Sequence, residues 1–386
     1  MRIALITDGI WPYVIGGMQK HSYFLCKYFA KNGIYIDLVH FNNSTFDISL
    51  LEFFSEEEKK FITPVIVNLP VSKKFPGHYI YNSYLHSKLI FEALKEKLKH
   101  YDFIYAKGFA GWYLINAKHK GEIKCCPIGV NFHGYEVLQP APSFKVKIQQ
   151  MLFLKNPIIK LSKKADVVFS YGGKITELIK QIGVKSANII EMPSGIEADS
   201  LAAEIKPCDE IKHFLFIGRY ERRKGIEELT RAIALLLKEK TRPFEFHFIG
   251  NIPEEKKLLN SNVFYHGEIR NKTDLFNEIK KHDVLVCPSY SEGFPNVILE
   301  AMASGLAIAA TPVGAVELLV NNQVGWIINK PTVIEILNIL NKVLQESPES
   351  VFAKKQEAFN SVKNKFSWDK IIRDLILKIE NKTLEK

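Results

Sequence analysis

Residues 284–301, with the sequence VLVCPSYSEGFPNVILEA, show the repeating unit of the fold most clearly. The first four of these residues are apolar and predict a buried strand, residues 288–296 are rich in Pro, Ser and Gly and predict a loop, and residues 297–303 predict a helix. In a parallel sheet with helical crossovers, such a loop leaves the carboxyl end of its strand, where ligands bind. We therefore expect this loop to belong to a binding site.

The same alternation of strand and helix runs along the chain. The expected strands are residues 3–7, 34–40, 65–69, 103–106, 127–132, 167–171 and 188–192, then 213–217, 244–249, 263–266, 284–287 and 307–310. The expected helices include residues 18–31, 86–99, 225–239, 272–281 and 297–303. Two successive series of this kind predict an α/β protein with two doubly wound, Rossmann-like parallel-sheet domains, joined within residues 193–207.

Length and composition agree with two globular domains. The 386 residues exceed what one hydrophobic core usually organises, and 47% apolar with 24% charged residues excludes disordered and fibrous classes. The five cysteines have no C-x-x-C spacing, which argues against a disulfide framework and a zinc site and predicts free thiols in a reducing cytoplasm. No apolar run is long enough to span a bilayer, so we expect a cytoplasmic protein.

Net charge is +10, and the basic excess is concentrated in the first half. Residues 145–164 mix six lysines with apolar side chains, and two interpretations stay open. The segment is either a surface helix in peripheral contact with an anionic membrane or an amphipathic helix whose lysines face water. No recognition motif accompanies the charge, so we expect no nucleic-acid partner.

The loop at residues 288–296 carries the first candidate site. Gly293 and the residues after it place backbone N–H groups at a helix start, where the helix dipole attracts a diphosphate. Glu292 and Glu300 are eight residues apart, which predicts that both project near one helix face. Their carboxylates suit paired sugar or ribose hydroxyls.

A second candidate site follows the strand at residues 213–217, in the sequence GRYERRKG at 218–225. A glycine and then cations at the mouth of a helix are suited to neutralising a leaving diphosphate. Arg219 offers a planar fork and Lys224 a point charge, so we expect these two to bind phosphate oxygens. Arg222 and Arg223 are expected to be solvated.

The pair of motifs, GRxxxxKG at 218–225 and PSxxEGFPxxxxEA at 288–301, resembles the family 4 retaining glycosyltransferases of the GT-B fold, or glycosyl transferases group 1. The resemblance extends over nearly the whole chain. Further matching segments are Gly16-Gly17, the NFHG at 131–134, the PSGIE at 193–197, the TPVG at 311–314 and the FSW at 366–368.

The resemblance implies a fold and a division of labour. Two Rossmann-like domains would face each other across a cleft, with residues 1–195 binding the acceptor and residues 196–365 the nucleotide sugar. Residues 366–386 would form a helix that crosses back to the first domain. Ser194 and Glu197 replace the usual Asn and Asp of the linker, Ala315 replaces a second glycine, and Gly250-Asn251 replaces Gly-x-Gly. These departures bear on hinge geometry and base contacts.

The resemblance also implies roles for single residues. Arg219 and Lys224 would hold the diphosphate, Glu300 the ribose, and Glu292 and His133 the transferred sugar. The catalytic set is then Arg219, Lys224, Glu292 and His133. The donor-binding set is Gly16, Gly17, Gly218, Gly293, Phe294, Pro295, Asn296, Val297 and Glu300.

The activity implied is transfer of a sugar from a nucleotide diphosphate of the UDP or GDP type to a hydroxyl of a glycan or lipid-linked acceptor, with retention of configuration. Cell-surface polysaccharide or lipopolysaccharide biosynthesis would be its setting, at the inner face of the plasma membrane. No Asp-x-Asp occurs in the chain, and we expect neither a metal nor another cofactor.

Three other classes share this architecture. A nicotinamide-dependent dehydrogenase would need Gly-x-Gly-x-x-Gly after the first strand, which is missing. A nucleotide-sugar epimerase and a non-catalytic carbohydrate-binding relative remain as alternatives. The sugar, the base and the acceptor depend on loop geometry at residues 77–84, 108–112 and 135–144.

Overall fold

The computed structural model of the chain describes residues 1–43, 45–70, 75, 77–239 and 242–384. The chain divides into two compact units. Unit 1 contains Met1–Leu138, Lys145–Ser194 and Trp368–Lys386, and unit 2 contains Gln139–Phe144 and Gly195–Ser367. The chain therefore contributes the short segment Gln139–Phe144 to unit 2, passes into unit 2 again after Ser194 and returns to unit 1 at Trp368.

Unit 1 is built on a seven-stranded parallel sheet in the order β3-β2-β1-β4-β5-β6-β7. Its strands are β1 Arg2–Ile6, β2 Tyr35–His40, β3 Ile62–Ile66, β4 Phe103–Lys107, β5 Ile128–Asn131, β6 Val167–Ser170 and β7 Ile189–Glu191. Its helices are α1 Gly17–Lys31, α2 Glu56–Lys59, α3 His78–Leu94, α4 Trp112–His119, α5 Phe144–Gln149, α6 Lys155–Lys164, α7 Lys174–Gln181 and α13 Trp368–Leu384.

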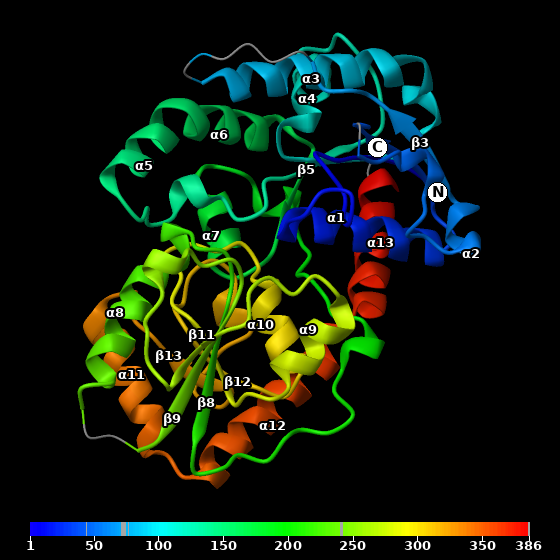
Figure 1. The fold of residues 1–386 in the computed structure, drawn as a ribbon. Helices are drawn as coiled ribbons and strands as arrows, with labels where there is room; N and C mark the ends of the chain where they lie inside the picture. The colour runs from blue at the N-terminus through cyan, green and yellow to red at the C-terminus, as the bar shows by residue number, and fades with distance from the viewer. Residues whose placement is uncertain (44, 71–74, 76, 240–241, 385–386) are drawn as a thin grey trace. The chain divides into compact units, whose positions relative to one another are not determined.

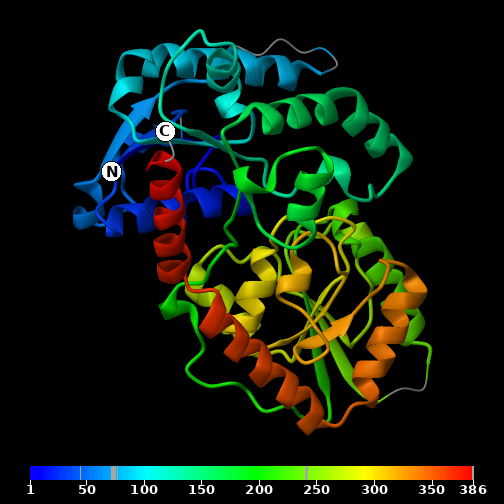
Figure 2. The same ribbon diagram turned by 180° about the vertical axis from the view of Figure 1, so that it is seen from behind.

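The last helix, α13, completes the core of unit 1. Trp368 is fully buried and stacks on Phe24 of α1, with ring centroids 5.2 Å apart. Ile372 and Ile379 extend the same apolar face of α13 into the core formed by α1 and the sheet. Figures 1 and 2 show α1 and α13 on one face of this sheet and α3 and α4 on the other. Burial of this apolar stripe, spaced at helical periodicity, attaches the C-terminal segment to unit 1.

Unit 2 is built on a six-stranded parallel sheet in the order β10-β9-β8-β11-β12-β13. Its strands are β8 Lys212–Ile217, β9 Phe244–Ile249, β10 Val263–Tyr265, β11 Val284–Cys287, β12 Ala307–Ala310 and β13 Gly325–Ile327. Its helices are α8 Ile226–Leu236, α9 Lys272–Ile279, α10 Asn296–Ala303, α11 Val333–Gln345 and α12 Pro348–Lys365.

The two faces of the unit 2 sheet are covered by different helices. Phe214, Phe246 and Phe248 alternate along β8 and β9 and pack into a core with α8 and α11. The other face carries α9 and α10 (Figure 1). Strands buried on both faces between helices are what near-continuous apolar runs predict.

The predicted fold class is confirmed, since both units are doubly wound parallel-sheet domains. The bounds expected for the strand at residues 65–69 are wrong by three residues. The observed strand, β3, spans Ile62–Ile66 and includes Pro64, which the prediction left outside the strand. A proline is tolerated there because β3 lies at the sheet edge. The helix expected at 86–99 begins earlier, directly after Gly77, and ends at Leu94. The three-residue strand β13 was not predicted.

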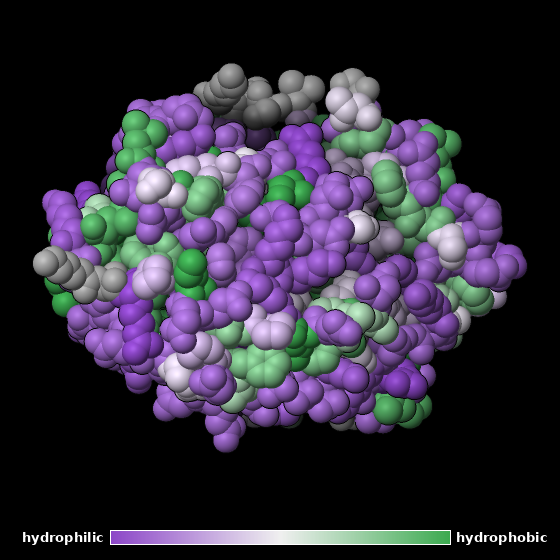
Figure 3. Space-filling model, turned by 60° about the horizontal axis from the view of Figure 1, so that its bottom comes forward, coloured by the Kyte–Doolittle hydropathy of each residue, from purple (hydrophilic) through white to green (hydrophobic). Residues whose placement is uncertain are grey.

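The surface of the molecule agrees with its composition. The face in Figure 3 is mostly hydrophilic, and its apolar side chains are scattered. Among the described helices, none combines the length and the apolar character that a membrane crossing requires. The cysteines are free thiols, of which Cys26 and Cys287 are buried.

Candidate active site

The loops predicted to bind ligand both leave the middle of the unit 2 sheet. Strands β8 and β11 are neighbours there, and the chain continues from β8 toward β9 and β10 but from β11 toward β12 and β13. Open α/β sheets bind ligands at such a switch point, beyond the carboxyl ends of the strands. Residues 218–225 follow β8 and residues 288–295 follow β11, so tertiary structure brings the two motifs to one place.

Glu292 is the buried centre of this place, with a residue exposure of 5%. Lys224 Nζ lies 2.7 Å from its Oε1, and the hydroxyl of Ser289 donates to the same oxygen at 2.7 Å. Arg223 Nη1 donates to Oε2 at 3.3 Å. Burial would raise the pKa of Glu292, but Lys224 and then Arg223 hold that pKa below its ordinary value. The carboxylate is therefore ionised at neutral pH.

Charges of alternating sign continue outward from Glu292. Arg223 Nη2 lies 3.4 Å from Glu221 Oε2, and Arg219 Nη2 lies 2.7 Å from Glu221 Oε1. The side chain of Arg219 is 77% exposed. We call these five side chains the charge cluster: Arg219, Glu221, Arg223, Lys224 and Glu292. Three cations and two carboxylates leave the cluster with one positive charge, which suits an anionic ligand.

The expectation that Arg222 and Arg223 are solvated is wrong. Arg223 belongs to the charge cluster, and Arg222 donates from Nη1 to Glu228 Oε2 at 2.6 Å. Arg222 also stacks its guanidinium over the ring of Tyr290 at 4.9 Å. These contacts tie the start of α8 to the loop after β11. No local pattern in the sequence predicts the contacts with Glu292 and Tyr290, because these partners are more than 60 residues from the arginines along the chain. The contact between Arg222 and Glu228 joins neighbouring segments.

The two glutamates of the first motif do not share a helix face, contrary to the prediction. Glu292 lies in the loop before α10, which begins at Asn296, whereas Glu300 lies within α10 and is 7% exposed. Glu292 is positioned by its side-chain partners and not by helical periodicity. The eight-residue spacing therefore had no bearing on its orientation.

The residues between these glutamates form the start of α10. Phe294 is buried, and its ring lies 5.9 Å from that of Phe366, so its side chain belongs to the packing of unit 2. Pro295 is the N-cap, and Asn296 and Val297 occupy the first turn. The amides of a first turn have no carbonyl four residues earlier within the helix, and they carry the positive end of its dipole.

Close backbone contacts hold the loops in place. Gly225 has φ +68°, and a Cβ there would lie 2.0 Å from the carbonyl oxygen of Pro288. Gly314 has φ +57°, and a Cβ there would lie 2.0 Å from the backbone carbonyl oxygen of Glu292. Gly250 meets the oxygen of Gly218 in the same way, at 2.0 Å. At Gly218 itself a Cβ would make only ordinary contacts, from 3.4 Å outward. The first three glycines are thus required by packing, and Gly218 is not.

In unit 1, His133 lies in a strained turn after β5. The backbone φ angles of His133 and Tyr135 are +55° and +50°, values that residues other than glycine rarely adopt. Nδ1 of His133 lies 2.6 Å from the hydroxyl of Tyr171, and the His133 amide donates to Asn131 Oδ1 at 2.9 Å. Gly16 is the N-cap of α1 and Gly17 its first residue, in the connection that follows β1. Gly16, Gly17 and His133 therefore belong to unit 1, whereas the residues of the charge cluster belong to unit 2.

A buried pair in unit 1 was missed from the sequence. Lys107 at the end of β4 is fully buried, and its Nζ donates to Nδ1 of His21 at 2.7 Å. Burial lowers the pKa of Lys107 to about 7, partly offset by Asp8. Burial also lowers the pKa of His21 well below its ordinary value. A lysine ending a strand carried no signal of its own, because its partner is 86 residues away.

Comparison with known proteins identifies the family. Residues 211–346, which contain the whole charge cluster, match the model of Glycosyl transferases group 1. The uncharacterized glycosyltransferase MJ1178 of Methanocaldococcus jannaschii is 27% identical over 378 residues, 95% of each chain. This protein is a glycosyltransferase of the group 1 type. The capsular polysaccharide biosynthesis glycosyltransferase CapM of Staphylococcus aureus is 26% identical over 212 residues, 50% of this chain and 54% of CapM.

Solved structures place the glycosyltransferase in the GT-B fold. Sucrose-phosphate synthase from Thermosynechococcus elongatus superposes with a TM-score of 0.77 at 19% identity, over 100% of both chains. Anabaena Alr3699/HepE in complex with UDP and glucose superposes with a TM-score of 0.69 at 15% identity, over 99% of this chain and 100% of that chain. Both matches extend over both units, so the fold holds for the whole glycosyltransferase.

One cavity of the glycosyltransferase lies in unit 1 beside His133. It has a volume of about 650 Å³ and includes Asp8 and Gly134 in its wall. Most of its other walls are apolar, among them Phe41, Leu69, Phe109, Phe132, Leu154 and Ile158. A cavity of this size and polarity suits an organic ligand.

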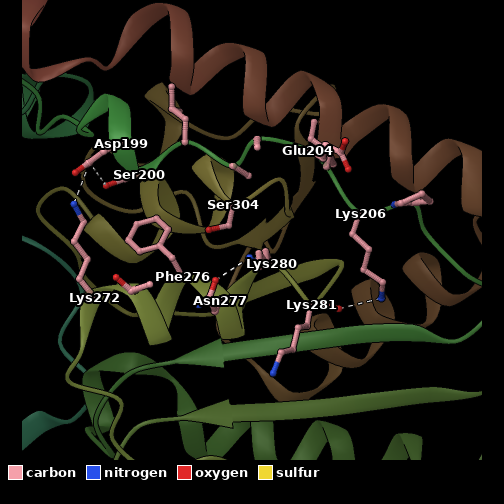
Figure 4. Close-up of a pocket in the computed structure, with 16 residues that line it drawn as sticks. Asp199, Ser200, Glu204, Lys206, Lys272, Phe276, Asn277, Lys280, Lys281 and Ser304 are labelled. Atoms are coloured by element: carbon pink, nitrogen blue, oxygen red, sulfur yellow. Dashed lines mark hydrogen bonds and ion pairs between the residues drawn. The ribbon is translucent and has the colours of Figure 1, made fainter.

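A groove of about 750 Å³ lies in unit 2 between α9 and residues 199–207 (Figure 4). Lys281 and Ser304, which line it, lie three residues before the starts of β11 and β12, so the groove lies near the amino ends of these strands. Lys272 at its rim is paired with Glu197 at 2.9 Å and Asp199 at 3.1 Å. The charge cluster lies beyond the carboxyl ends of the strands, and this groove is therefore not the donor site.

Proposed function

We propose that the glycosyltransferase moves a sugar from a nucleotide diphosphate of the UDP or GDP type to a hydroxyl of a glycan or lipid-linked glycan, with retention of anomeric configuration. The charge cluster at the switch point of unit 2 carries the proposal. It combines a buried, ionised carboxylate with three cations, beside a helix start. The UDP complex of a protein with the same fold supports a nucleotide donor.

The diphosphate is assigned to Arg219, Lys224 and the first turn of α10. Arg219 is exposed and can turn from Glu221 to a phosphate, and a diphosphate competes with Glu292 for Lys224. Amides of Asn296 and Val297 add the helix dipole. Packing within the protein does not require a glycine at position 218. We attribute the glycine there to close approach of the donor. We assign Gly293 and Pro295 to the same contact surface.

The sugar and ribose are assigned to carboxylates and to His133. Glu300, on α10, accepts hydrogen bonds from ribose hydroxyls, and Glu292 accepts them from the transferred sugar. With the Tyr171 hydroxyl as donor to Nδ1, His133 carries its proton on Nε2 and can donate it to a sugar oxygen. The strained turn at His133 is consistent with a functional orientation. Gly16 and Gly17 complete the proposed donor contacts in unit 1.

The proposed step uses no protein nucleophile and no metal. The bond between the anomeric carbon and the diphosphate oxygen breaks while the acceptor oxygen bonds to the same face of that carbon. The acceptor proton passes to an oxygen of the departing diphosphate. Arg219 and Lys224 stabilise the charge that develops on the diphosphate, which is the largest protein contribution in such a step.

The acceptor is assigned to unit 1, and a lipid-linked acceptor is the preferred class. The cavity beside His133 is largely apolar, and residues 144–164 form α5, a π-helical turn at Gln150–Leu154 and α6. Met151 and Leu152 are 50% and 68% exposed among the lysines of this segment. Exposed apolar side chains with basic neighbours bind the headgroup region of anionic bilayers. The relative CapM supports a role in surface polysaccharide synthesis.

A donor screen tests the proposal. Purified protein is heated with UDP, GDP, ADP or buffer, and we expect one nucleoside diphosphate to raise the Tm because it binds the folded state. The sugar forms of that nucleotide are then incubated with lipid-linked glycans in the presence of EDTA, and the product anomer is assigned by NMR. Stabilisation by none of the nucleotides refutes the donor site, and an inverted anomer refutes retention. Activity abolished by EDTA in protein that remains folded refutes the metal-free step.

Membrane contact is tested by sedimentation with vesicles. We expect binding to phosphatidylglycerol vesicles at low salt and loss of binding in Leu152→Glu. The matched control is Ile334→Glu, since Ile334 is 60% exposed on α11 of unit 2. Equal binding by Leu152→Glu and the unmodified protein would remove residues 144–164 from the membrane contact.

A further inference from the structure

A cluster of imidazoles lies in unit 2, on the sheet face opposite the aromatic core. Four of the chain's 11 histidines gather there from separate elements. His213 lies on β8 and His247 on β9, where they alternate with the phenylalanines that face α8 and α11. His266 directly follows β10, and His282 lies between α9 and β11. Sheet order, and not sequence spacing, brings them together.

The distances within this histidine cluster match those of a metal-binding set. One ligand atom from each of His247, His266 and His282 lies within 4.8 Å of the other two. Nδ1 of His247 and Nε2 of His266 are 2.9 Å apart. Oε1 of Glu278, on α9, lies 3.6 Å from the same Nε2, while its Oε2 is held by Lys281 at 2.6 Å. Three imidazole nitrogens therefore lie close together, and the carboxylate of Glu278 lies beside the nitrogen of His266.

The outer partners of the imidazoles direct the right nitrogens inward. Nε2 of His247 lies 3.1 Å from Oε2 of Glu245, so its Nε2–H donates there and Nδ1 keeps its lone pair. Nδ1 of His282 donates to the carbonyl of Ile279 at 3.3 Å, which leaves the lone pair on Nε2. A carboxylate behind His247 and a carbonyl behind His282 are the kind of outer partner that orients histidines in metal sites.

We propose that His247, His266, His282 and Glu278 form a binding site for a transition metal ion of the zinc class. Three imidazoles and one carboxylate give the tetrahedral four-ligand set of a closed, structural zinc site. Imidazole donors favour zinc, cobalt, nickel or copper over magnesium and calcium, which prefer all-oxygen sets. The site is separate from the charge cluster, and the ion would take no part in the chemical step of the transfer.

A bound ion would cross-link four parts of unit 2. It would join β9, the residue after β10, helix α9 and the connection between α9 and β11. Beyond His247 and His266, the amide of Gly250 donates to the oxygen of Gly267 at 2.7 Å, and Gly250 packs on the oxygen of Gly218. The ion would therefore stabilise the edge of the sheet that supports the loop containing Arg219. Stabilisation of the folded unit is the expected consequence.

The test uses the full chain without a polyhistidine tag. The protein is stripped with EDTA, dialysed against ZnCl₂ and then against buffer, and its metal content is measured by mass spectrometry. We expect one zinc per chain, a higher Tm in zinc, and a tetrahedral absorption spectrum when Co(II) replaces zinc. His282→Gln should weaken zinc binding at least about tenfold, as loss of metal-site groups does. His119→Gln, which alters an exposed histidine of unit 1, should leave binding unchanged.

A second variant keeps the test decisive if His282→Gln does not fold, because His282 is buried. The side chain of His266 is 28% exposed, so His266→Gln should fold and should weaken zinc binding to a similar degree. The proposal is overturned if the native chain retains less than one zinc after dialysis. It is also overturned if His266→Gln binds zinc as the native chain does, or if His119→Gln loses binding equally.

Discussion

Nζ of Lys224 lies 2.7 Å from Oε1 of Glu292, and the side chains of both residues are largely buried, with exposures of 18% and 7%. The two residues come from separate motifs and meet at the switch point of the unit 2 sheet. We expect this ion pair to serve two purposes that mutation can separate. It compensates a buried carboxylate in the ligand-free protein, and it presents a cation to the proposed diphosphate.

The first prediction separates these purposes. Lys224→Met should lower the free energy of unfolding by roughly 2 kcal/mol, because a buried carboxylate loses one partner while Arg223 remains. The double variant with Glu292→Gln should recover most of that stability, since no buried charge is left. Both should transfer sugar at least about 100-fold more slowly. Urea denaturation and a transfer assay measure the two effects. Full activity in Lys224→Met would refute its role toward phosphate.

The second prediction concerns Arg223, which the sequence did not single out. Arg223→Leu should lower kcat/KM about tenfold, as loss of one charged hydrogen bond does. Arg223 helps to lower the pKa of Glu292, so its removal raises that pKa. Glu292 then protonates at higher pH, and the acidic limb of the pH–rate profile should move upward. Arg270→Leu is the control, since the side chain of Arg270 is 75% exposed and pairs with Glu268; an equal effect there would contradict the prediction.

The third prediction concerns the glycines between the loops. Gly225→Ala and Gly314→Ala each force a Cβ to within 2.0 Å of a backbone oxygen at positive φ, and should destabilise by more than about 3 kcal/mol. Gly267→Ala is matched to them, because Gly267 has φ +70° but no atom within 4 Å of the added Cβ. Its cost should be only about 1 kcal/mol, from the backbone alone. Equal Tm losses in all three variants would show that positive φ, and not crowding, dominates.

The fourth prediction follows from the low pKa of Lys107. Between about pH 7 and pH 10, the lysine is neutral in the folded protein but protonated in the unfolded chain. The unfolded state binds more protons, so stability should rise with pH, by about 1.4 kcal/mol per unit from this group. Lys107→Met should lack that rise. Lys120→Met, at a side chain 63% exposed, should keep it. Urea denaturation from pH 7 to pH 9 measures the slopes, and identical slopes in all three proteins would contradict the assignment.

Much of the fold could be predicted because its signals are local. The apolar runs of β8, β9, β11 and β12 are bounded by polar turns, and strands and helices differ in hydrophobic period. The predictions of β13 and β3 failed for physical reasons. Strand β13 begins with Gly325, whose Cβ would lie 1.8 Å from the oxygen of Ile308, so close pairing requires a glycine that signals no strand. Strand β3 contains a proline that only its edge position permits.

The candidate site was predictable as a set of positions. Glycine, cations and carboxylates in strand-to-helix loops are visible in the sequence, and parallel sheets gather such loops at one edge. The partners of each side chain were not predictable. The contact of Arg223 with Glu292 spans 69 residues, and that of Lys107 with His21 spans 86. The prediction that Glu292 lies on a helix face with Glu300 was wrong, because Glu292 precedes α10.

The amino-acid sequence alone was enough to predict two doubly wound units, the two motif loops and, from the family that these loops resemble, the reaction class. All of these follow from patterns within about 20 residues of chain, where backbone periodicity and turn chemistry act. The folded structure was needed to show which charges pair around Glu292, which glycines are held by backbone contact, and that four histidines meet near α9. Those relations depend on strand order and register, which join residues that no local pattern connects.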